Sequence, residues 1–169
     1  KNASLIGVHG PVGRGTRHPE KKELVGSVLA IVDDEKPFIT VEGATQLRGL
    51  QFYYPNQTIT DPAKVIEYPP TIKVSTREWC LGVTLSCLTF YGEFVAMDFD
   101  SPNPEQRNEQ ILFEHCYGYP LSGTFIKINY CWDIPRVIHC HVNPANLRYF
   151  KGEFSNEIID SVIARGTYA

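Results

Sequence analysis

A short apolar pattern recurs five times along this chain and constrains its fold more than any other feature of the sequence. Each copy has an apolar residue, a small or apolar residue three positions later, and another two positions after that. The copies begin at Leu47, Leu85, Phe113, Val137 and Ile159, so the steps between them are 38, 28, 24 and 22 residues. A period that shortens toward roughly 20–25 residues is typical of stacked, coiled architectures in which each repeat packs on its neighbours.

The register of the repeat predicts which side chains lie above one another. Equivalent residues of neighbouring coils should be about 4.8 Å apart, as in any ladder of β-strands. The residues that begin the copies should form one inward column. A second inward column should contain Leu50, Leu88, Cys116, Cys140 and Val162. A turn column should follow, with Tyr54, Gly92, Pro120, Pro144 and Gly166. No stretch keeps a 3.6-residue period over three turns, so we predict an all-β solenoid of parallel strands.

Composition limits the class of protein further. With 169 residues and 43% hydrophobic content, the chain can bury a core as a single domain. A formal net charge of -3 argues against a nucleic-acid partner bound through a general basic field. No apolar run approaches the roughly 20 residues that cross a bilayer, so membrane insertion is not expected. None of the five cysteines forms a CxxC pair, so the sequence indicates neither a disulfide framework nor a zinc knuckle.

The order of segments follows the repeat. Residues 1–23 are an initial Gly- and charge-rich segment, and 24–169 should form the coils of one domain or part of one. Strands are expected at 24–32, 38–41, 71–75 and 95–99, and polar loops at 56–70 and 101–108. Such insertions leave a solenoid as loops on one face, often the binding face. The missing initiator Met and the apparently uncapped end coils predict that the sequence is a piece of a longer helix.

Two segments resemble stretches that recur in one protein family. The first contains YGYPL (117–121), GxFI (123–126), YCWDI (130–134), Arg136 and CHxNP (140–144), and the second contains FYYPxQ (52–57) and YPP (68–70). Together they resemble pectate-lyase-like, polygalacturonase-related proteins, over about residues 45–150. The chain departs from that pattern at His115 and His139, where the family often carries Asn, and at Pro135, where Gly is usual.

The resemblance implies a right-handed parallel β-helix. The family that the chain resembles includes bacteriophage tailspike depolymerases. The resemblance therefore implies that the chain binds a polysaccharide and degrades it, as a glycoside hydrolase or a polysaccharide lyase. If the protein is a tailspike, the resemblance also implies a homotrimer on the virion tail. A secreted bacterial lyase or hydrolase and a non-catalytic, carbohydrate-binding or structural β-helix stay open as alternatives. No cofactor is expected, apart from Ca²⁺ if the protein is a lyase. The motifs transfer no catalytic residue.

Paired acids are the first candidates for chemistry. Asp98 and Asp100 are two residues apart on a strand whose inward residues should be Val95, Met97 and Phe99. Their carboxylates should share the outer face, with Cα atoms about 6.6–6.8 Å apart. Glycosidases use two carboxylates, about 5–5.5 Å apart for retention and about 6.5–9.5 Å apart for inversion. We therefore predict Asp98 and Asp100 as catalytic residues, while a solvated face is the alternative interpretation. Glu93 and Glu114 are the nearest candidates for a third acid, and Glu93 is preferred.

Aromatic and histidine columns are the other candidates. Flat rings with polar tips suit the faces of sugars. Predicted substrate-binding residues are Tyr53, Tyr91, Tyr117, Tyr119 and Trp132, with a structural aromatic stack as the alternative. Trp79 is expected to be a core residue or a loop anchor. His115 and His139 should stack at the bend shared with Gly49 and Cys87. A hydrogen-bonded ladder is preferred there over a metal site, so no metal ligand is predicted.

Overall fold

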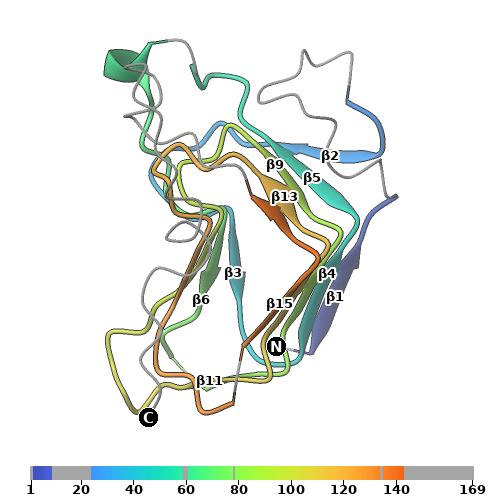
Figure 1. Ribbon diagram of the computed structural model, residues 1–169, viewed down its shortest axis with the longest axis vertical. Helices are drawn as coiled ribbons and strands as arrows, with labels where there is room; N and C mark the ends of the chain where they lie inside the picture. The colour runs from blue at the N-terminus through green and yellow to red at the C-terminus, as the bar shows by residue number, and fades with distance from the viewer. Residues whose placement is uncertain (1, 9–23, 59–60, 78, 134, 143–169) are drawn as a thin grey trace.

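The computed structural model describes residues 2–8, 24–58, 61–77, 79–133 and 135–142. Within these ranges the chain forms short β-strands and one turn of 3-10 helix, η2 (Pro62–Lys64), with no α-helix (Figure 1). No helix in this part of the chain is long and apolar enough to cross a membrane. The fifth copy of the repeat, with Gly166 of the turn column, lies outside the described residues, as do Pro144 of the fourth copy and residues 9–23 of the initial segment.

All strand pairs among the described residues are parallel, and they form four sheets. Sheet A contains β1 (Ala3–Ile6), β4 (Thr45–Arg48), β8 (Thr84–Ser86), β12 (Leu112–Glu114) and β15 (Arg136–Ile138). Sheet B contains β2 (Ser27–Ala30), β5 (Leu50–Tyr53), β9 (Thr89–Tyr91), β13 (Tyr117–Gly118) and β16 (His141–Val142). Sheet C contains β3 (Ile39–Val41), β6 (Ile72–Val74), β10 (Met97–Phe99) and β14 (Ile126–Ile128). Sheet D contains β7 (Cys80–Leu81) and β11 (Asn108–Glu109).

Sheets A, B and C each take one strand from successive coils, so the strands of a sheet lie one behind another when the molecule is viewed along the stack (Figure 1). Sheets A, B and C form three walls around the interior. This arrangement is all-β and compatible with a parallel β-helix. The predicted strands at 38–41, 71–75 and 95–99 are present in sheet C with shorter bounds. The segment 56–70 leaves the stack as predicted, and η2 is the teal-green helical turn that projects from it in Figure 1.

The predicted register is confirmed in the described coils. Leu47 pairs with Leu85, Leu85 with Phe113, and Phe113 with Val137. In sheet B, Gln51 pairs with Thr89, Thr89 with Tyr117, and Tyr117 with His141. The residue directly before each of these belongs to the predicted second column, so that column is also in register. That column is Leu50, Leu88, Cys116 and Cys140, of which the first three are buried and Cys140 packs against the core. Apolar residues therefore stack from coil to coil, and their burial is the main stabilising contribution.

A one-residue bend joins sheet A to sheet B after β4, β8, β12 and β15. Gly49 (φ 69°), Cys87 (φ 52°), His115 (φ 50°) and His139 (φ 51°) occupy it, which confirms the predicted bend column. The left-handed conformation costs a non-glycine residue roughly 1–2 kcal/mol, so packing on both sides must hold the bend. A second left-handed column precedes sheet A at Asn2, Ala44, Gly82 and Gln110. The sequence analysis did not identify it, because these four residues share no chemical character.

One expected strand differs in the structure. The segment 24–32 was predicted to be a buried strand, but only Ser27–Ala30 forms β2, and its side chains are half-buried or exposed. The reason is its place in the stack, because β2 is the end strand of sheet B and pairs only with β5. Leu29 still packs against the core, so an apolar run at the end of a sheet is covered on one side.

Candidate functional site

Both tryptophans of the chain lie together on the surface beside sheet D. Trp79 directly precedes β7, and Trp132 directly follows Cys131, which bridges to Asn108 of β11. Their ring centroids are 5.7 Å apart at an interplanar angle of 65°. Trp79 is 48% exposed and Trp132 is 55% exposed. Large rings are usually buried, so two adjacent open indoles mark a surface that is suited to contact another molecule.

Arg107 completes the aromatic surface. Its guanidinium carbon lies 4.2 Å from the centroid of the Trp132 ring, a cation–π contact. Its Nε donates a hydrogen bond to the Pro104 carbonyl at 3.3 Å, which helps to hold the side chain in this position. Cys80 pairs with Asn108 and Asn108 with Cys131, so the stacking of coils brings Trp79, Arg107 and Trp132 together from distant parts of the sequence.

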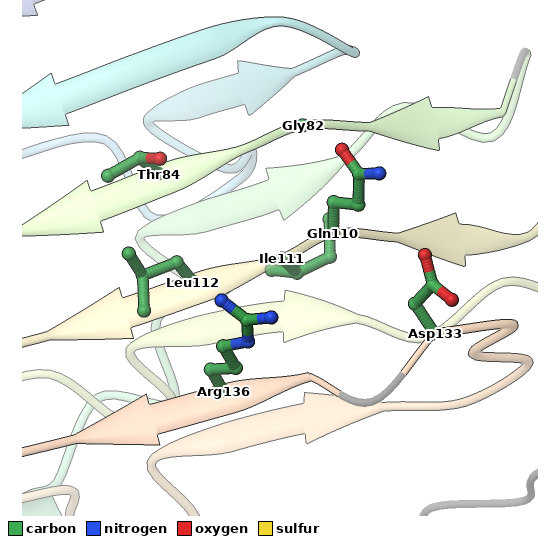
Figure 2. A pocket seen from close by; sticks show the side chains of 7 residues that line it. All are labelled: Gly82, Thr84, Gln110, Ile111, Leu112, Asp133 and Arg136. Carbon is green, nitrogen blue, oxygen red and sulfur yellow. The ribbon is translucent and has the colours of Figure 1, made fainter.

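A cleft of about 660 Å³ opens on the outer face of sheet A (Figure 2). Thr84 and Leu112 pair in register, as do Leu112 and Arg136, so these three side chains come from neighbouring coils. The lining is completed by residues of the bends and turns before these strands, which are Gly82, Gln110, Ile111 and Asp133. The volume falls within the roughly 300–1,000 Å³ of small-molecule sites.

The cleft and the aromatic surface adjoin. Asp133 lines the cleft and directly follows Trp132 in the chain. Figure 2 shows the Asp133 carboxylate and the Gln110 amide at one end of the cleft, with Arg136 and Leu112 further along. Open indole faces, a guanidinium, a carboxylate and an amide are therefore displayed along two adjacent outer surfaces of the stack, those of sheets D and A.

Of the predicted catalytic pair, Asp98 lies in β10 of sheet C with a side chain that is only 10% exposed, and Asp100 directly follows that strand. Met97 and Phe99 are fully buried, as predicted, so Asp98 between them faces outward from sheet C. The Asp98 carboxylate accepts a hydrogen bond from the Asp100 backbone N–H at 2.9 Å and lies 3.4 Å from Lys73 Nζ. Asp98 also pairs in register with Lys127 on its other side. Asp98 thus belongs to a ladder of alternating charge along sheet C, and the residues that line the sheet A cleft do not include Asp98 or Asp100.

Glu93 is apart from the other two acids. Its side chain is fully buried, and neither carboxylate oxygen has a hydrogen-bond partner among the described residues. Burial raises the pKa of Glu93 to about 8. The backbone N–H groups of Glu93, Tyr119 and Gly92 favour the charged carboxylate and lower the pKa by a smaller amount. Gly118 and Phe125 lie against the space that Oε1 occupies. Glu93 is therefore in the interior, while Asp98 faces outward from sheet C.

The tyrosines predicted to bind substrate are stacked as expected but are closed off from solvent. Tyr53 pairs with Tyr91, and Tyr119 continues this column. Tyr53 is 8% exposed, Tyr91 2%, Tyr117 3% and Tyr119 6%. Trp132 is the one member of the predicted set with an open ring. The Tyr117 ring packs on that of Tyr119, with ring centroids 5.4 Å apart.

The histidine and cysteine columns are also formed. The His115 and His139 rings are 4.9 Å apart, and no group of three potential metal ligands occurs in the part of the chain that the structure describes. All five cysteines are free thiols. Cys116 and Cys140 lie in one column on neighbouring coils, and the interaction with Cys140 together with burial raises the pKa of the Cys116 thiol.

Sequence reasoning did not identify several residues of this surface as functional. Trp79 was expected in the core or as a loop anchor, and Arg107, Gln110, Asp133 and Arg136 were not singled out for a site. A usable signal was present, because each tryptophan adjoins a cysteine, Cys80 or Cys131, and these two cysteines share a column. No family model, curated protein or solved structure matches this chain.

Proposed function

We propose that this chain belongs to a polysaccharide-binding, right-handed parallel β-helix of the pectate-lyase-like kind. The observation that carries the proposal is the exposed pair Trp79 and Trp132, fixed by Arg107 beside a polar cleft. Sugars present C–H faces and hydroxyl edges, so they pair with open aromatic faces and nearby hydrogen-bonding groups. A stack of coils also offers a long regular surface, which suits an extended chain ligand.

The right-handed form is favoured on general grounds. Crossovers between parallel strands of one sheet are right-handed in about 98% of cases. The resemblance of residues 45–150 to pectate-lyase-like segments supports the same proposal, since that family has this handedness. A tailspike-type protein would place the chain in a homotrimer on a virion tail, and a secreted bacterial enzyme is the alternative location. The molar mass of the purified protein, measured by light scattering, distinguishes a trimer from a monomer.

Replacing Trp79 or Trp132 with alanine should weaken polysaccharide binding about 5- to 150-fold, because stacking of a ring on an aromatic side chain is worth roughly 1–3 kcal/mol. Affinity electrophoresis in gels with a panel of soluble polysaccharides measures this loss. The chain has only these 2 tryptophans, so quenching of its intrinsic tryptophan fluorescence on binding reports directly on the proposed surface.

A matched control for this test is Val32→Ala, which removes an exposed apolar side chain in the loop after β2. Val32→Ala should bind as the wild type does. The proposal is wrong if the wild type binds no polysaccharide of the panel, or if both tryptophan variants bind as tightly as the wild type.

Cleavage of the bound polysaccharide is a second proposal, which rests on the carboxylates predicted from the sequence. If Asp98 and Asp100 are catalytic, Asp98→Asn and Asp100→Asn should each reduce the release of new sugar ends at least about 100-fold, as loss of a general acid or base does. New reducing ends indicate hydrolysis, and unsaturated ends whose release needs Ca²⁺ indicate a lyase.

Lys73→Met is the control for cleavage, because it breaks the ion pair of Asp98 and keeps the carboxylate. It should leave the rate of cleavage nearly unchanged. Equal rates for Asp98→Asn and the wild type would assign Asp98 to the charge ladder of sheet C and favour the non-catalytic, carbohydrate-binding protein. Glu93 is fully buried, and its replacement is better tested through stability, as described below.

A further inference from the structure

The cleft on the outer face of sheet A displays a balanced pair of charges. Asp133 and Arg136 line it with one negative and one positive side chain, and both are exposed. Within the described residues they form no ion pair with each other, so the carboxylate and the guanidinium face the cleft as separate groups. Gln110 and Thr84 add neutral polar groups, and Ile111 and Leu112 add an apolar surface.

We propose that this cleft is the subsite for an uncharged sugar ring of the polysaccharide, with Asp133 and Arg136 as its specificity-determining residues. The inference rests on the proposed function and adds the chemical class of the ligand. A carboxylate accepts hydrogen bonds from hydroxyl groups and a guanidinium donates to them, while each sugar hydroxyl can do both. A neutral polyol can therefore satisfy both side chains at once.

An acidic sugar fits the cleft less well. A uronate carboxylate that reaches Arg136 also meets the field of Asp133, and like charges brought together at an interface are strongly unfavourable. An anion-binding site would be expected to carry an excess of positive charge, and the residues lining this cleft carry none. The apolar side chains of Ile111 and Leu112 provide a surface for the C–H face of a ring.

The position beside the aromatic surface supports a continuous binding path. Trp132 and Asp133 are consecutive residues, and Trp132 follows the Cys131 that stacks on Asn108. A sugar on the indole face and a second sugar in the cleft can therefore belong to one chain, the first held by stacking and the second by hydrogen bonds. Specificity between sugars would then come from the cleft, because every pyranose has a face that can stack.

The test compares neutral polysaccharides (galactomannan, xyloglucan and dextran) with anionic ones (polygalacturonate and alginate) by affinity electrophoresis and tryptophan fluorescence. We expect the wild type to bind at least one neutral polysaccharide at least 10-fold more tightly than either anionic one. Asp133→Asn should weaken this neutral binding about 10-fold or more and narrow the preference over anionic chains, since hydrogen bonds to a carboxylate are stronger than those to a neutral amide. Arg136→Gln should weaken neutral binding to a similar extent.

Two surface variants outside the cleft serve as controls. Glu105→Gln removes an exposed carboxylate and Arg77→Gln an exposed guanidinium, and both should bind as the wild type does. The proposed subsite is wrong if the wild type binds only anionic polysaccharides, or if Asp133→Asn and Arg136→Gln leave the binding of neutral polysaccharides unchanged. In either case the proposed function still stands if the tryptophan variants lose binding. If the wild type binds none of the five polysaccharides, both the subsite and the proposed function are wrong.

Discussion

The stability of this protein should fall as the pH rises from about 5 to 8, and Glu93→Gln should abolish most of that fall. Glu93 has a pKa raised from 4.5 to about 8 in the folded chain because its carboxyl is fully buried. In the unfolded chain it ionises at its ordinary pKa, so between these values folding takes up a proton. The contribution of Glu93 to stability is therefore largest below pH 4.5 and decreases by about 1.4 kcal/mol per pH unit until the folded pKa is reached.

The measurement is urea unfolding of the wild type and Glu93→Gln at several pH values. The free energy of unfolding of the variant relative to the wild type should rise by about 4 kcal/mol between pH 5 and 8. This change does not depend on the fixed cost of burying a glutamine amide, which is the same at each pH. Glu105→Gln, on an exposed loop, is the matched control and should keep the wild-type slope. Parallel slopes for the wild type and Glu93→Gln would show that Glu93 ionises freely in the folded protein.

Gly118→Ala should destabilise the fold by about 3 kcal/mol, the upper end of the range that overpacking a rigid core typically costs. In the core column of sheet B, Gly118 follows Phe52 and Phe90, where the repeat favours an apolar side chain. A Cβ at Gly118 would overlap both the Glu93 carboxylate and the Phe125 ring, which are fully buried. The ring of Phe125 already packs edge-on against Phe90 in this space, with centroids 5.5 Å apart.

Gly82→Ala is the informative comparison for Gly118→Ala. An added Cβ at Gly82 meets no atom within 4 Å, but its φ of +71° is left-handed. Its cost should therefore be about 1 kcal/mol, from backbone conformation alone. Phe125→Leu, which removes part of the clashing ring, should reduce the penalty of Gly118→Ala in a double-mutant cycle. A free energy of unfolding for Gly118→Ala within 1 kcal/mol of the wild-type value would mean that this part of the core adapts easily.

Together, the buried acid and the glycine show how a core with unequal coils is filled. The column that holds Phe52 and Phe90 reaches Gly118 in the next coil. The space of the missing side chain is filled by the ring of Phe125, which directly precedes β14, and by the carboxyl of Glu93 from the turn after β9. A pKa of about 8 keeps Glu93 mostly protonated at neutral pH. Burying the neutral carboxyl costs less free energy than burying a carboxylate would.

The repeat in the sequence was sufficient to predict the parallel, all-β stack and its register. Apolar residues at a fixed offset can be buried together only if the coils are superposed, so the pairs of Leu47 with Leu85 and of Leu85 with Phe113 follow from the pattern alone. The bend at His115 and His139 followed for the same reason. The outward direction of Asp98 followed from the two-residue period of a strand, because Met97 and Phe99 had to face the core.

Only the tertiary structure decided which outer surfaces are open and what gathers on them. The tyrosine column was predicted from spacing, but solvent exposure depends on what covers a sheet, and Tyr91 is buried while Trp79 is open. Asp133 and Arg136 share a cleft with Thr84 because three coils stack there, although 49 residues separate Thr84 from Asp133. A periodic pattern records which side chains face the core, because burial selects for apolar character, whereas it carries no comparable signal for the positions of polar groups on the outside.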